Sequence, residues 1–413
     1  MTLFKFTLFL CLLALTSCHV PRFFIRNFAN ITDHKIFPYT EVATGDDIVE
    51  FPSRPDVETA NAPLSLKAGK TDLTTWLSEE TSTTAFLVLK HDTIVYERYF
   101  RGYGPADIST IFSVSKSVTS LLAGIAVDER KIEDINDPVT KYIPELREAD
   151  PGFKKLTIRH LLNMRSGLNF KESYGSPFSH MAKLYYGTNQ LRQLSKLKFA
   201  HEPGTHHAYQ SGTTALLGIV IERATGVELG KYLEAKVWKP MGMEFPATWS
   251  LDDKRHRSSK AYSGLNTTAR DLAKIGKLYA DGGKWRGKQI VSANWVRQST
   301  TPNMANDGYQ FQWYSVTNTY DDDEGDTKYF PDSLAAATAG QALDFEKIYA
   351  QPSQKHPGKW YLESTDGAFY AQGILNQFVY VNPKEDLVII RQGEKWDNGY
   401  LWLFEMLGGK WER

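Results

Sequence analysis

The stretch Thr110-Ile111-Phe112-Ser113-Val114-Ser115-Lys116-Ser117-Val118 combines a short polar pattern with the start of an apolar, helical one. It contains the pattern Ser-x-x-Lys, formed by Ser113 and Lys116. The apolar residues that follow have helical spacing, which predicts a helix that begins near Ser113 and turns an apolar stripe inward: Val118, Leu121, Leu122 and Ile125. On such a helix Ser113 and Lys116 lie on one face, with Cβ atoms roughly 5–6 Å apart.

This spacing suits nucleophilic catalysis. A serine hydroxyl is a poor nucleophile at neutral pH, and it needs a neighbouring base. A lysine can serve as that base where burial and nearby positive charge favour its neutral amine. A serine at a helix N-terminus also has backbone N–H groups that can face a developing oxyanion. The pattern therefore predicts Ser113 as the nucleophile and Lys116 as its base, with part of an anion site beside them.

Ser-x-x-Lys alone is a weak signal, because the chain contains a second copy at Ser195-Lys196-Leu197-Lys198. That copy follows a polar run and has no apolar helix behind it, so we interpret Ser195 as an exposed serine on a solvated face. For Ser113 the alternative is a helix N-cap without catalytic role. The further motifs described below weigh against that alternative.

Composition narrows the class of protein. The 413 residues include 48 basic and 48 acidic side chains, so the net charge is zero with histidine neutral. This balance argues against nucleic acid or an acidic polymer as the main partner. A hydrophobic content of 42% is ample for a packed core and predicts a globular chain. The length allows two domains or one large domain with an insertion.

The N-terminus resembles a bacterial lipoprotein signal. Residues 1–17 have a basic start at Lys5 and an apolar core too short to span a bilayer, which predicts a secretory signal peptide. The core closes on Ser17-Cys18, so we expect Cys18 to become the lipidated first residue of the mature protein; the alternative is an ordinary signal peptide cut nearby. The expected location is the bacterial cell envelope, on the periplasmic or outer-membrane side. Cys11 would leave with the signal, so no intramolecular disulfide is expected.

Strand patterns occur at both ends of the chain and helical patterns between them. Two hairpins are predicted, at 84–90 with 93–99 and at 378–381 with 387–391. Helices are predicted from the caps Thr157 and Thr268, at 216–221, and at 400–407. We therefore expect a tether and extended segment at 18–60 and one domain at 61–413. Its sheet would come from about 75–125 and 270–413, with a helical insertion at about 126–269.

Two further segments carry candidate site residues. The run His207-Ala208-Tyr209-Gln210-Ser211-Gly212 precedes a helix, and a tyrosine held near a lysine can relay a proton to a leaving group. The alternative for Tyr209 is a half-buried loop tyrosine. The run 367–373 is a strand of small residues that could offer backbone N–H groups to a substrate carbonyl. Its alternative is a close-packed strand in which glycine only relieves crowding.

Taken in order, these motifs resemble the serine β-lactamase-related family, class C branch. The resemblance covers roughly residues 75–413, and the chain is most similar to 6-aminohexanoate-dimer hydrolases and to related family VIII esterases. It rests on the following segments: 112–116, Ile158-Arg159-His160-Leu161-Leu162 with Ser166-Gly167-Leu168, Pro203-Gly204 with Tyr209, 268–273, and Gly373 with Gln377 and Val379. It implies an α/β (α+β) fold, β-lactamase/transpeptidase-like, in which an antiparallel β-sheet is flanked by helices and joined to a helical subdomain.

The resemblance also implies roles for individual residues. Ser113 matches the acylated nucleophile, Lys116 its base, and Tyr209 the tyrosine of the second family motif. Gly373 matches the glycine of the third motif, which puts the N–H of Ile374 beside that of Ser113 in the oxyanion hole. Substrate contacts are implied for Tyr174, which resembles a substrate-closing tyrosine, and for Ser211, Gln372 and Gly373. No cofactor is implied.

Two positions depart from the family pattern. The second motif usually reads Tyr-x-Asn, and here it ends in Ser211, so an amide contact to the substrate is shortened or lost. The third motif usually begins with lysine or histidine, and here it has Ala371. That cation binds the substrate carboxylate through a charge-assisted hydrogen bond worth about 1.5–3 kcal/mol. Its loss argues against strong β-lactamase or D,D-peptidase activity.

The leading hypothesis is a serine hydrolase that cleaves small amides or esters through an acyl-enzyme. The alternatives are a weak β-lactamase or D,D-peptidase-like enzyme and a non-catalytic, penicillin-binding-like recognition protein. We expect no catalytic metal, because Pro203-Gly204 breaks any helix between His201 and His206. We expect the substrate to be chosen by the loops at 169–200 and 301–360. The natural substrate and the oligomeric state stay open.

Overall fold

The computed structural model describes residues 19–26, 29–54, 63–66, 69–306, 308–321, 326–343, 347–353, 355–397 and 400–407. The predicted signal peptide and the predicted lipidation site at Cys18 lie outside these residues. Among the described helices, none has both the length and the apolar character that crossing a bilayer requires.

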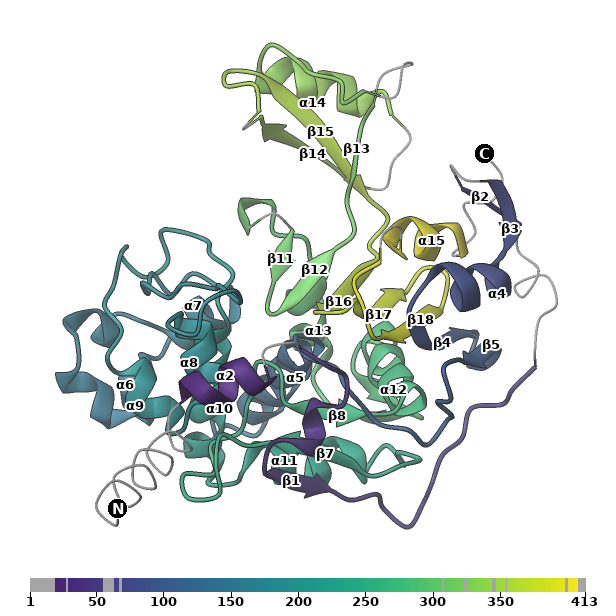
Figure 1. Cartoon of the computed structure of the whole chain (residues 1–413). Coiled ribbons are helices and arrows are strands. Elements are labelled where there is room, and N and C mark those ends of the chain that lie inside the picture. Colours follow the sequence, from purple (N-terminus) through teal and green to yellow (C-terminus); the bar gives the residue numbers. More distant parts are fainter. Residues whose placement is uncertain are drawn as a thin grey trace, which may run out of the picture.

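A seven-stranded antiparallel sheet organises one half of the molecule (Figure 1). Its order is β11-β12-β16-β17-β18-β4-β5, so the strands come from both ends of the described chain. The central contact is between β18 and β4, where Ile390 lies opposite Leu87. The strand bounds are β4 Thr83–Lys90, β5 Thr93–Tyr99, β11 Tyr309–Gln310, β12 Trp313–Ser315, β16 Phe369–Gly373, β17 Gln377–Asn382 and β18 Leu387–Gly393.

Both predicted hairpins are present in this sheet. The β4–β5 turn consists of His91 and Asp92, whose φ angles of 48° and 57° give the left-handed backbone that a two-residue turn between twisted strands requires. β4 is buried along almost its whole length, because helices cover both faces of the sheet. Its side chains alternate between two apolar clusters, with Leu87 in one and Phe86 in the other.

Helices cover the two faces of the sheet. α12 (Ala269–Ala280) packs on β17, β18 and β4, and its cap is the predicted one, since the Thr268 side chain accepts a hydrogen bond from the Asp271 N–H. Helix and sheet approach closely at Gly276, where an added Cβ would lie 2.5 Å from a Val388 methyl. The other face is covered by α4 (Leu73–Thr75), the π-helical turn η2 (Trp76–Glu80) and α15 (Tyr400–Leu407).

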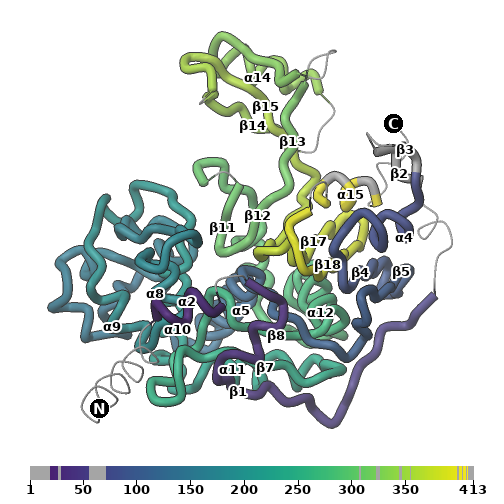
Figure 2. Tube along the Cα trace, viewed as in Figure 1, coloured from purple at the N-terminus to yellow at the C-terminus, as the bar shows by residue number. Residues whose placement is uncertain are grey.

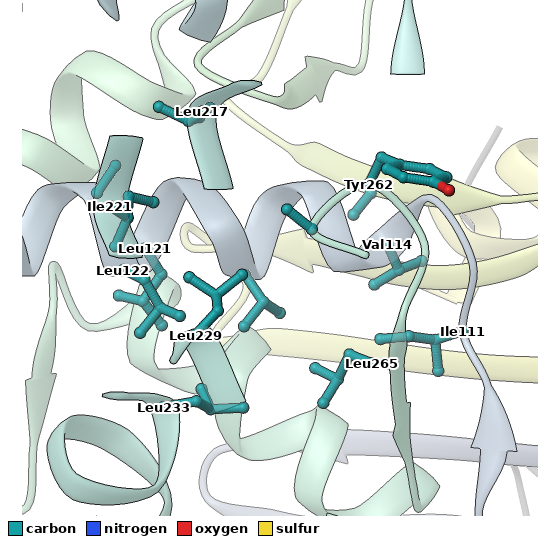
Figure 3. Close-up of a cluster of buried hydrophobic side chains, with 14 of the residues drawn as sticks. Ile111, Val114, Leu121, Leu122, Leu217, Ile221, Leu229, Leu233, Tyr262 and Leu265 are labelled. Atoms are coloured by element: carbon teal, nitrogen blue, oxygen red, sulfur yellow. The ribbon is translucent and has the colours of Figure 1, made fainter. Parts of the chain in front are cut away.

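A helical region beside the sheet surrounds α5 (Val114–Asp128), the helix predicted from the Ser-x-x-Lys stretch (Figure 1). α5 is buried along almost its whole length. Figure 3 shows its residues Leu121 and Leu122 beside Ile221 of α10 (Ser211–Thr225) and Leu229 of α11 (Leu229–Leu233) in one apolar cluster. The helices of this region are α6 Val139–Tyr142, α7 Ile158–Leu162, α8 His180–Tyr186, α9 Gln190–Leu194, α10 Ser211–Thr225 and α11 Leu229–Leu233.

The described residues of 19–54 fold onto this body, in the segment where we expected a tether and an extended stretch. The apolar side chain of Phe23 anchors helix α2 (His19–Arg26) against α8, because its ring contacts Tyr186 edge to face. Further along, β1 (Tyr39–Val42) joins a second sheet of order β1-β7-β8-β6. The other strands of that sheet are β6 Ser109–Thr110, β7 Ala247–Ser250 and β8 Leu265–Thr267. β6 and β8 bring this sheet next to the start of α5.

A small unit projects from the main sheet between β12 and β16 (Figures 1 and 2). It consists of the sheet β13-β15-β14 and helix α14, and the sequence analysis did not separate it from the rest of the domain. Its bounds are β13 Asn318–Thr319, α14 Ser333–Gln341, β14 Lys347–Pro352 and β15 Trp360–Thr365. The remaining strands and α-helix are β2 Pro63–Leu66, β3 Gly69–Asp72, β9 Lys284–Trp285, β10 Lys288–Gln289 and α13 Ala293–Thr300.

Candidate active site

Ser113 occupies the N-cap position of α5, but its side chain makes no cap hydrogen bond. The preceding residue, Phe112, has a φ of 46°, a left-handed conformation that is uncommon for a bulky residue and characteristic of functional sites. β8 holds this turn in place, because the Ile111 N–H donates to the Leu265 carbonyl and the Leu265 N–H donates to the Ser115 hydroxyl. The Ser113 side chain therefore does not cap α5, and its hydroxyl is available for another partner.

That partner is Lys116. Its Nζ donates to the Ser113 Oγ over 2.9 Å and to the Tyr262 carbonyl over 2.9 Å. The lysine is only 1% exposed, so it points into the protein and not toward solvent. The Tyr262 carbonyl accepts a hydrogen bond from Lys116 and thereby orients the amine toward Ser113. This arrangement suits an amine that removes a proton from the serine.

Tyr209 comes from the loop before α10 and lies against the same lysine. The Lys116 Nζ is 4.9 Å from the centre of the Tyr209 ring, a distance at which the ring face attracts a positive charge. The two residues are 93 positions apart in sequence, and only the packing of α10 on α5 brings them together. The trio predicted from separate motifs therefore forms one cluster.

A column of tyrosines supports Tyr209 from the strand side, and no pattern in the sequence indicated it. Tyr314 stacks on Tyr209 with ring centres 6.5 Å apart, and Tyr370 stacks on Tyr314 at 5.2 Å. Tyr314 and Tyr370 face each other across the β12–β16 pair. Burial raises the pKa of Tyr370 to about 12 and that of Tyr314 well above the ordinary value, so both phenols stay neutral. No local motif marks these residues, because strand pairing alone places them side by side.

Gly373 brings the end of β16 against the backbone of Ser113. A Cβ at this position would lie 2.4 Å from the Ile111 carbonyl oxygen and 3.2 Å from the Ser113 nitrogen. β12 pairs with β16 only at Phe369 and Tyr370, so the edge beyond them has no strand partner on that side among the described residues. Ile374, the next residue, lines the same cavity as Ser113. Glycine is required here for close approach of two backbones.

Glu172 connects two predicted substrate contacts and was itself missed. Its carboxylate accepts hydrogen bonds from the Ser211 N–H (2.8 Å), the Ser211 hydroxyl (2.7 Å) and the Tyr174 hydroxyl (2.7 Å). Tyr174 is 47% exposed, yet desolvation of its phenol, and then the Glu172 charge, raise its pKa above the ordinary value. Ser211 and Tyr174 both line the cavity, with their hydroxyls directed to Glu172. Only Tyr174 had drawn attention to this segment, by its resemblance to a family residue.

Gln372 lies differently from Gly373, because neighbouring residues of a strand point to opposite faces. Its side-chain amide donates to the Asn376 Oδ1 over 3.4 Å, within its own hairpin. Gln372 is not among the described residues that line the Ser113 cavity.

The cavity beside Ser113 has a volume of about 370 Å³ and an apolar lining. Its lining residues come from the N-terminal segment, α8, the Tyr262 loop and the turn after β16. Of the described residues in the unit between β12 and β16, none lines it, so the expectation that 301–360 forms the pocket wall is not met for this cavity. Residues 309–314 lie behind Tyr209 and support it, because the rings of Tyr309 and Tyr314 pack against the Tyr209 ring.

A buried arginine holds the turn that carries Ile374. Arg391 of β18 is fully buried, and its guanidinium donates to the carbonyls of Leu375 (2.5 Å) and Asn376 (2.9 Å). Its charge is balanced by Asp397 at 2.7 Å. Leu375 and Asn376 both have left-handed φ angles, 63° and 57°. Arg391 therefore acts as a positioning residue for the backbone next to the nucleophile.

The second Ser-x-x-Lys copy has a different geometry. The Ser195 hydroxyl donates to the Arg192 carbonyl at the end of α9, and Lys198 pairs with Asp150 at 3.3 Å. We expected Ser195 to be exposed, but it is half-buried at the C-terminal end of the short helix α9. The interpretation that it is not a nucleophile agrees with these partners.

One described cluster has the spacing of metal ligands, namely Asp252, Asp253 and His256. The two carboxylates already accept backbone N–H groups of their own turn, from Ser258 to Asp252 and from Arg255 to Asp253. These bonds explain the cluster as a loop brace. His201 and His206, which superficially suggested a zinc site, contact each other ring to ring at 4.6 Å.

Residues 74–392 match the protein-family model described as Beta-lactamase. The chain belongs to the β-lactamase family. The match covers most of the chain and confirms the resemblance inferred from the motifs and the predicted fold class. The segment 19–54 lies outside the residues that match the family model.

Relatives within the family are hydrolases by name. A 6-aminohexanoate-dimer hydrolase from Paenarthrobacter ureafaciens is 32% identical over 229 residues, which cover 53% of this chain and 57% of that protein. The matched region thus spans little more than half of that relative. A Salmonella agona protein with a provisional assignment as a D-alanyl-D-alanine carboxypeptidase is 27% identical over 150 residues, 34% of each protein.

Solved structures agree with the fold of this β-lactamase-family chain. A Bacillus anthracis protein with a provisional assignment as a 6-aminohexanoate-dimer hydrolase gives a TM-score of 0.71 at 22% identity, covering 92% of this chain and 91% of that one. EstCE1, described as a hydrolase with promiscuous acyltransferase activity, gives 0.54 at 15% identity, covering 78% and 90%. At these identities the likeness concerns the fold alone.

The family departure at Ala371 has a structural basis. Ala371 is 1% exposed and belongs to the main apolar cluster between the sheet and α5. The residues lining the Ser113 cavity carry no formal charge within the described part of the chain. This β-lactamase-family site therefore offers no cation at the place where the third motif usually has one.

Proposed function

We propose that the chain is a serine hydrolase that cleaves small amides or esters through an acyl-enzyme on Ser113. One observation carries the proposal: the buried Lys116 Nζ lies 2.9 Å from the Ser113 Oγ. In the first step the Lys116 amine accepts the hydroxyl proton while the serine oxygen bonds to the substrate carbonyl carbon. The charge that Lys116 gains faces the Tyr209 ring, which attracts it.

The tetrahedral intermediate needs donors for its negative oxygen. We assign this role to the backbone N–H groups of Ser113 and Ile374. Support comes from the close approach of Gly373 to Ser113 and from the hydrogen-bond pattern, since neither N–H has an acceptor among the described residues. Preorganised donors of this kind lower the barrier because they need no reorientation during the reaction.

Collapse of the intermediate breaks the carbonyl–leaving-group bond, and the leaving amine or alcohol takes a proton. We assign that proton to Lys116, with Tyr209 assisting its transfer. Water then attacks the acyl carbon while the same lysine accepts a proton from it; the bond between the acyl carbon and the Ser113 oxygen breaks, the acid is released, and Lys116 returns the proton to the Ser113 oxygen. Tyr174 and Ser211 serve as substrate contacts in the cavity wall, and their bonds to Glu172 fix their positions. Of the two β16 residues predicted to contact the substrate, Gly373 keeps this role through its close approach to Ser113, whereas Gln372, which bonds to Asn376, is not assigned one.

A fluorophosphonate probe tests the nucleophile directly. We expect it to label the wild-type protein at Ser113, because the probe captures activated serines, and to leave Ser113→Ala unlabelled. Mass spectrometry of the labelled peptide checks the site. Ser195→Ala is the matched control, since that serine belongs to the other Ser-x-x-Lys copy and should not affect labelling. A folded wild-type protein that takes up no more probe than Ser113→Ala would refute the proposal and favour a non-catalytic recognition protein.

The alternative of a weak β-lactamase or D,D-peptidase-like enzyme rests on the family and on the carboxypeptidase relative. We expect poor penicillin and nitrocefin turnover, with kcat/KM at least about tenfold below that for p-nitrophenyl acetate, because a charge-assisted bond to the substrate carboxylate is missing. Initial rates on the same protein preparation check this. Robust nitrocefin hydrolysis would contradict the argument from Ala371 and favour the alternative.

We further propose that Cys18 carries a lipid anchor that holds the enzyme in the bacterial cell envelope. The support is the sequence pattern that ends at Ser17-Cys18. Metabolic labelling with an alkyne fatty acid, lost in Cys18→Ser, tests this anchor independently of activity.

A further inference from the structure

The N-terminal segment forms part of the wall of the Ser113 cavity. Phe23 of α2 and Ala29, which follows that helix, line the same cavity as Ser113. Phe23 is 3% exposed, so its ring is packed into this wall and does not face the solvent. The family match begins at residue 74, and this part of the site is therefore not supplied by the matched region.

Several contacts fix α2 to α8. The Arg22 guanidinium donates to the Tyr186 carbonyl over 3.2 Å, and the Tyr186 hydroxyl donates to the Arg26 carbonyl over 2.6 Å. The rings of Phe23 and Tyr186 meet edge to face with centres 5.8 Å apart. Since these contacts run from the middle to the C-terminal end of the helix, α2 is a fixed part of the wall.

The cavity presents apolar groups even where it is lined by tyrosines. The Tyr185 hydroxyl donates to Asp33 (2.6 Å), the Tyr186 hydroxyl to Arg26, and the Tyr262 hydroxyl to the Leu184 carbonyl (3.0 Å). Their polar atoms are therefore engaged with the protein. Together with the absence of formal charge among the described lining residues, this favours an uncharged, apolar ligand group.

The position of the cavity relative to the base indicates which part of a substrate enters it. Lys116 and Tyr209 are not lining residues of the cavity, although Ser113 is. The leaving group must lie on the side of the proton donors, so the cavity lies on the acyl side of the reacting carbonyl. We infer that the cavity binds an uncharged, apolar acyl chain and that Phe23 and Ala29 of the N-terminal segment determine its length; this rests on the acyl-enzyme function proposed above.

The test is the ratio of kcat/KM for p-nitrophenyl octanoate to that for p-nitrophenyl acetate. We expect kcat/KM to rise about fourfold per added methylene over the first members of the series, because each buried methylene contributes about 0.8 kcal/mol. Phe23→Ala should lower the ratio about tenfold, since part of the apolar wall is lost. Phe24→Ala is the matched control, because this neighbour in the same helix is 70% exposed and should leave the ratio unchanged.

A second variant keeps the test independent of α2 packing. Ala29→Leu adds side-chain volume to the cavity, so it should lower the octanoate-to-acetate ratio about tenfold and shift the preferred chain to shorter acyl groups. A ratio that stays unchanged in both Phe23→Ala and Ala29→Leu overturns the inference. It is also overturned if, in a series of acetate esters, kcat/KM rises with the chain length of the alcohol, because the cavity would then bind the leaving group. In either case Ser113-dependent labelling and acetate hydrolysis would still support the proposed function. Absence of labelling and of all ester hydrolysis would overturn the function itself.

Discussion

We expect Lys116→Ala to lower kcat/KM for p-nitrophenyl acetate about 10⁴-fold, the loss that follows when a general base that acts as a unit with its nucleophile is removed. The reason is geometric. Lys116 is the amine that contacts the Ser113 hydroxyl, and because this contact is buried, a lysine on the surface cannot take its place. Initial rates, together with thermal unfolding of the purified variant, measure the loss and check that the fold is retained.

The chain supplies a matched control for this prediction. Lys198→Ala removes the lysine of the second Ser-x-x-Lys copy, whose partner is Asp150, and it should leave kcat/KM unchanged. Added methylamine should restore part of the rate in Lys116→Ala and have no effect on Ser113→Ala, because a small amine can replace a base but not a nucleophile. A folded Lys116→Ala protein that keeps a tenth of the wild-type rate would contradict the assigned base.

Gly373→Ala should reduce kcat about 10²- to 10³-fold, the loss typical of one misplaced oxyanion donor. The added Cβ would lie 2.4 Å from the Ile111 carbonyl oxygen, so either the Ser113 turn or the end of β16 must shift. Such a shift separates the Ser113 and Ile374 N–H groups from the position of the oxyanion. Because these groups act mainly in the transition state, KM should change much less than kcat.

Gly104→Ala is the control for backbone effects of an added methyl group. At Gly104 the nearest atom to an added Cβ is an Asp107 carboxylate oxygen at 3.7 Å, an ordinary contact. We expect wild-type kcat for this variant. Steady-state kinetics and a melting curve for both variants separate a local effect from unfolding. Wild-type kcat in a folded Gly373→Ala protein would show that the turn after β16 does not contribute the second donor.

Much of the fold could be predicted from local patterns. The hairpin at His91-Asp92 and the helix capped by Thr268 depend on short-range chemistry, namely a two-residue turn and a side chain that accepts an N–H of the first helical turn. The start of α5 was also predictable, because its apolar spacing begins right after Ser113. In contrast, α2 was not predicted, since a helix of eight residues is stabilised mainly by the surface on which it packs.

The candidate site likewise has one part that local patterns predict and another that they do not. The Ser113–Lys116 pair follows from helix geometry, since residues three apart share a face. Glu172 could not be found, because its role depends on two partners, Ser211 and Tyr174, that come from different loops. Tyr314 could not be found either, because its place beside Tyr209 results from the pairing of β12 with β16 and the packing of α10.

The sequence by itself determined the family and the loss of a cation at Ala371, and it predicted the pair of Ser113 and Lys116, because each of these depends on residue identities at short spacing. Only the tertiary structure decided that Tyr209 meets Lys116, that Gly373 touches the nucleophile's backbone, and that Phe23 enters the cavity wall. The physical reason is that these contacts join segments distant in sequence. Their distances are set by how helices and strands pack, and no local pattern of residues encodes that packing.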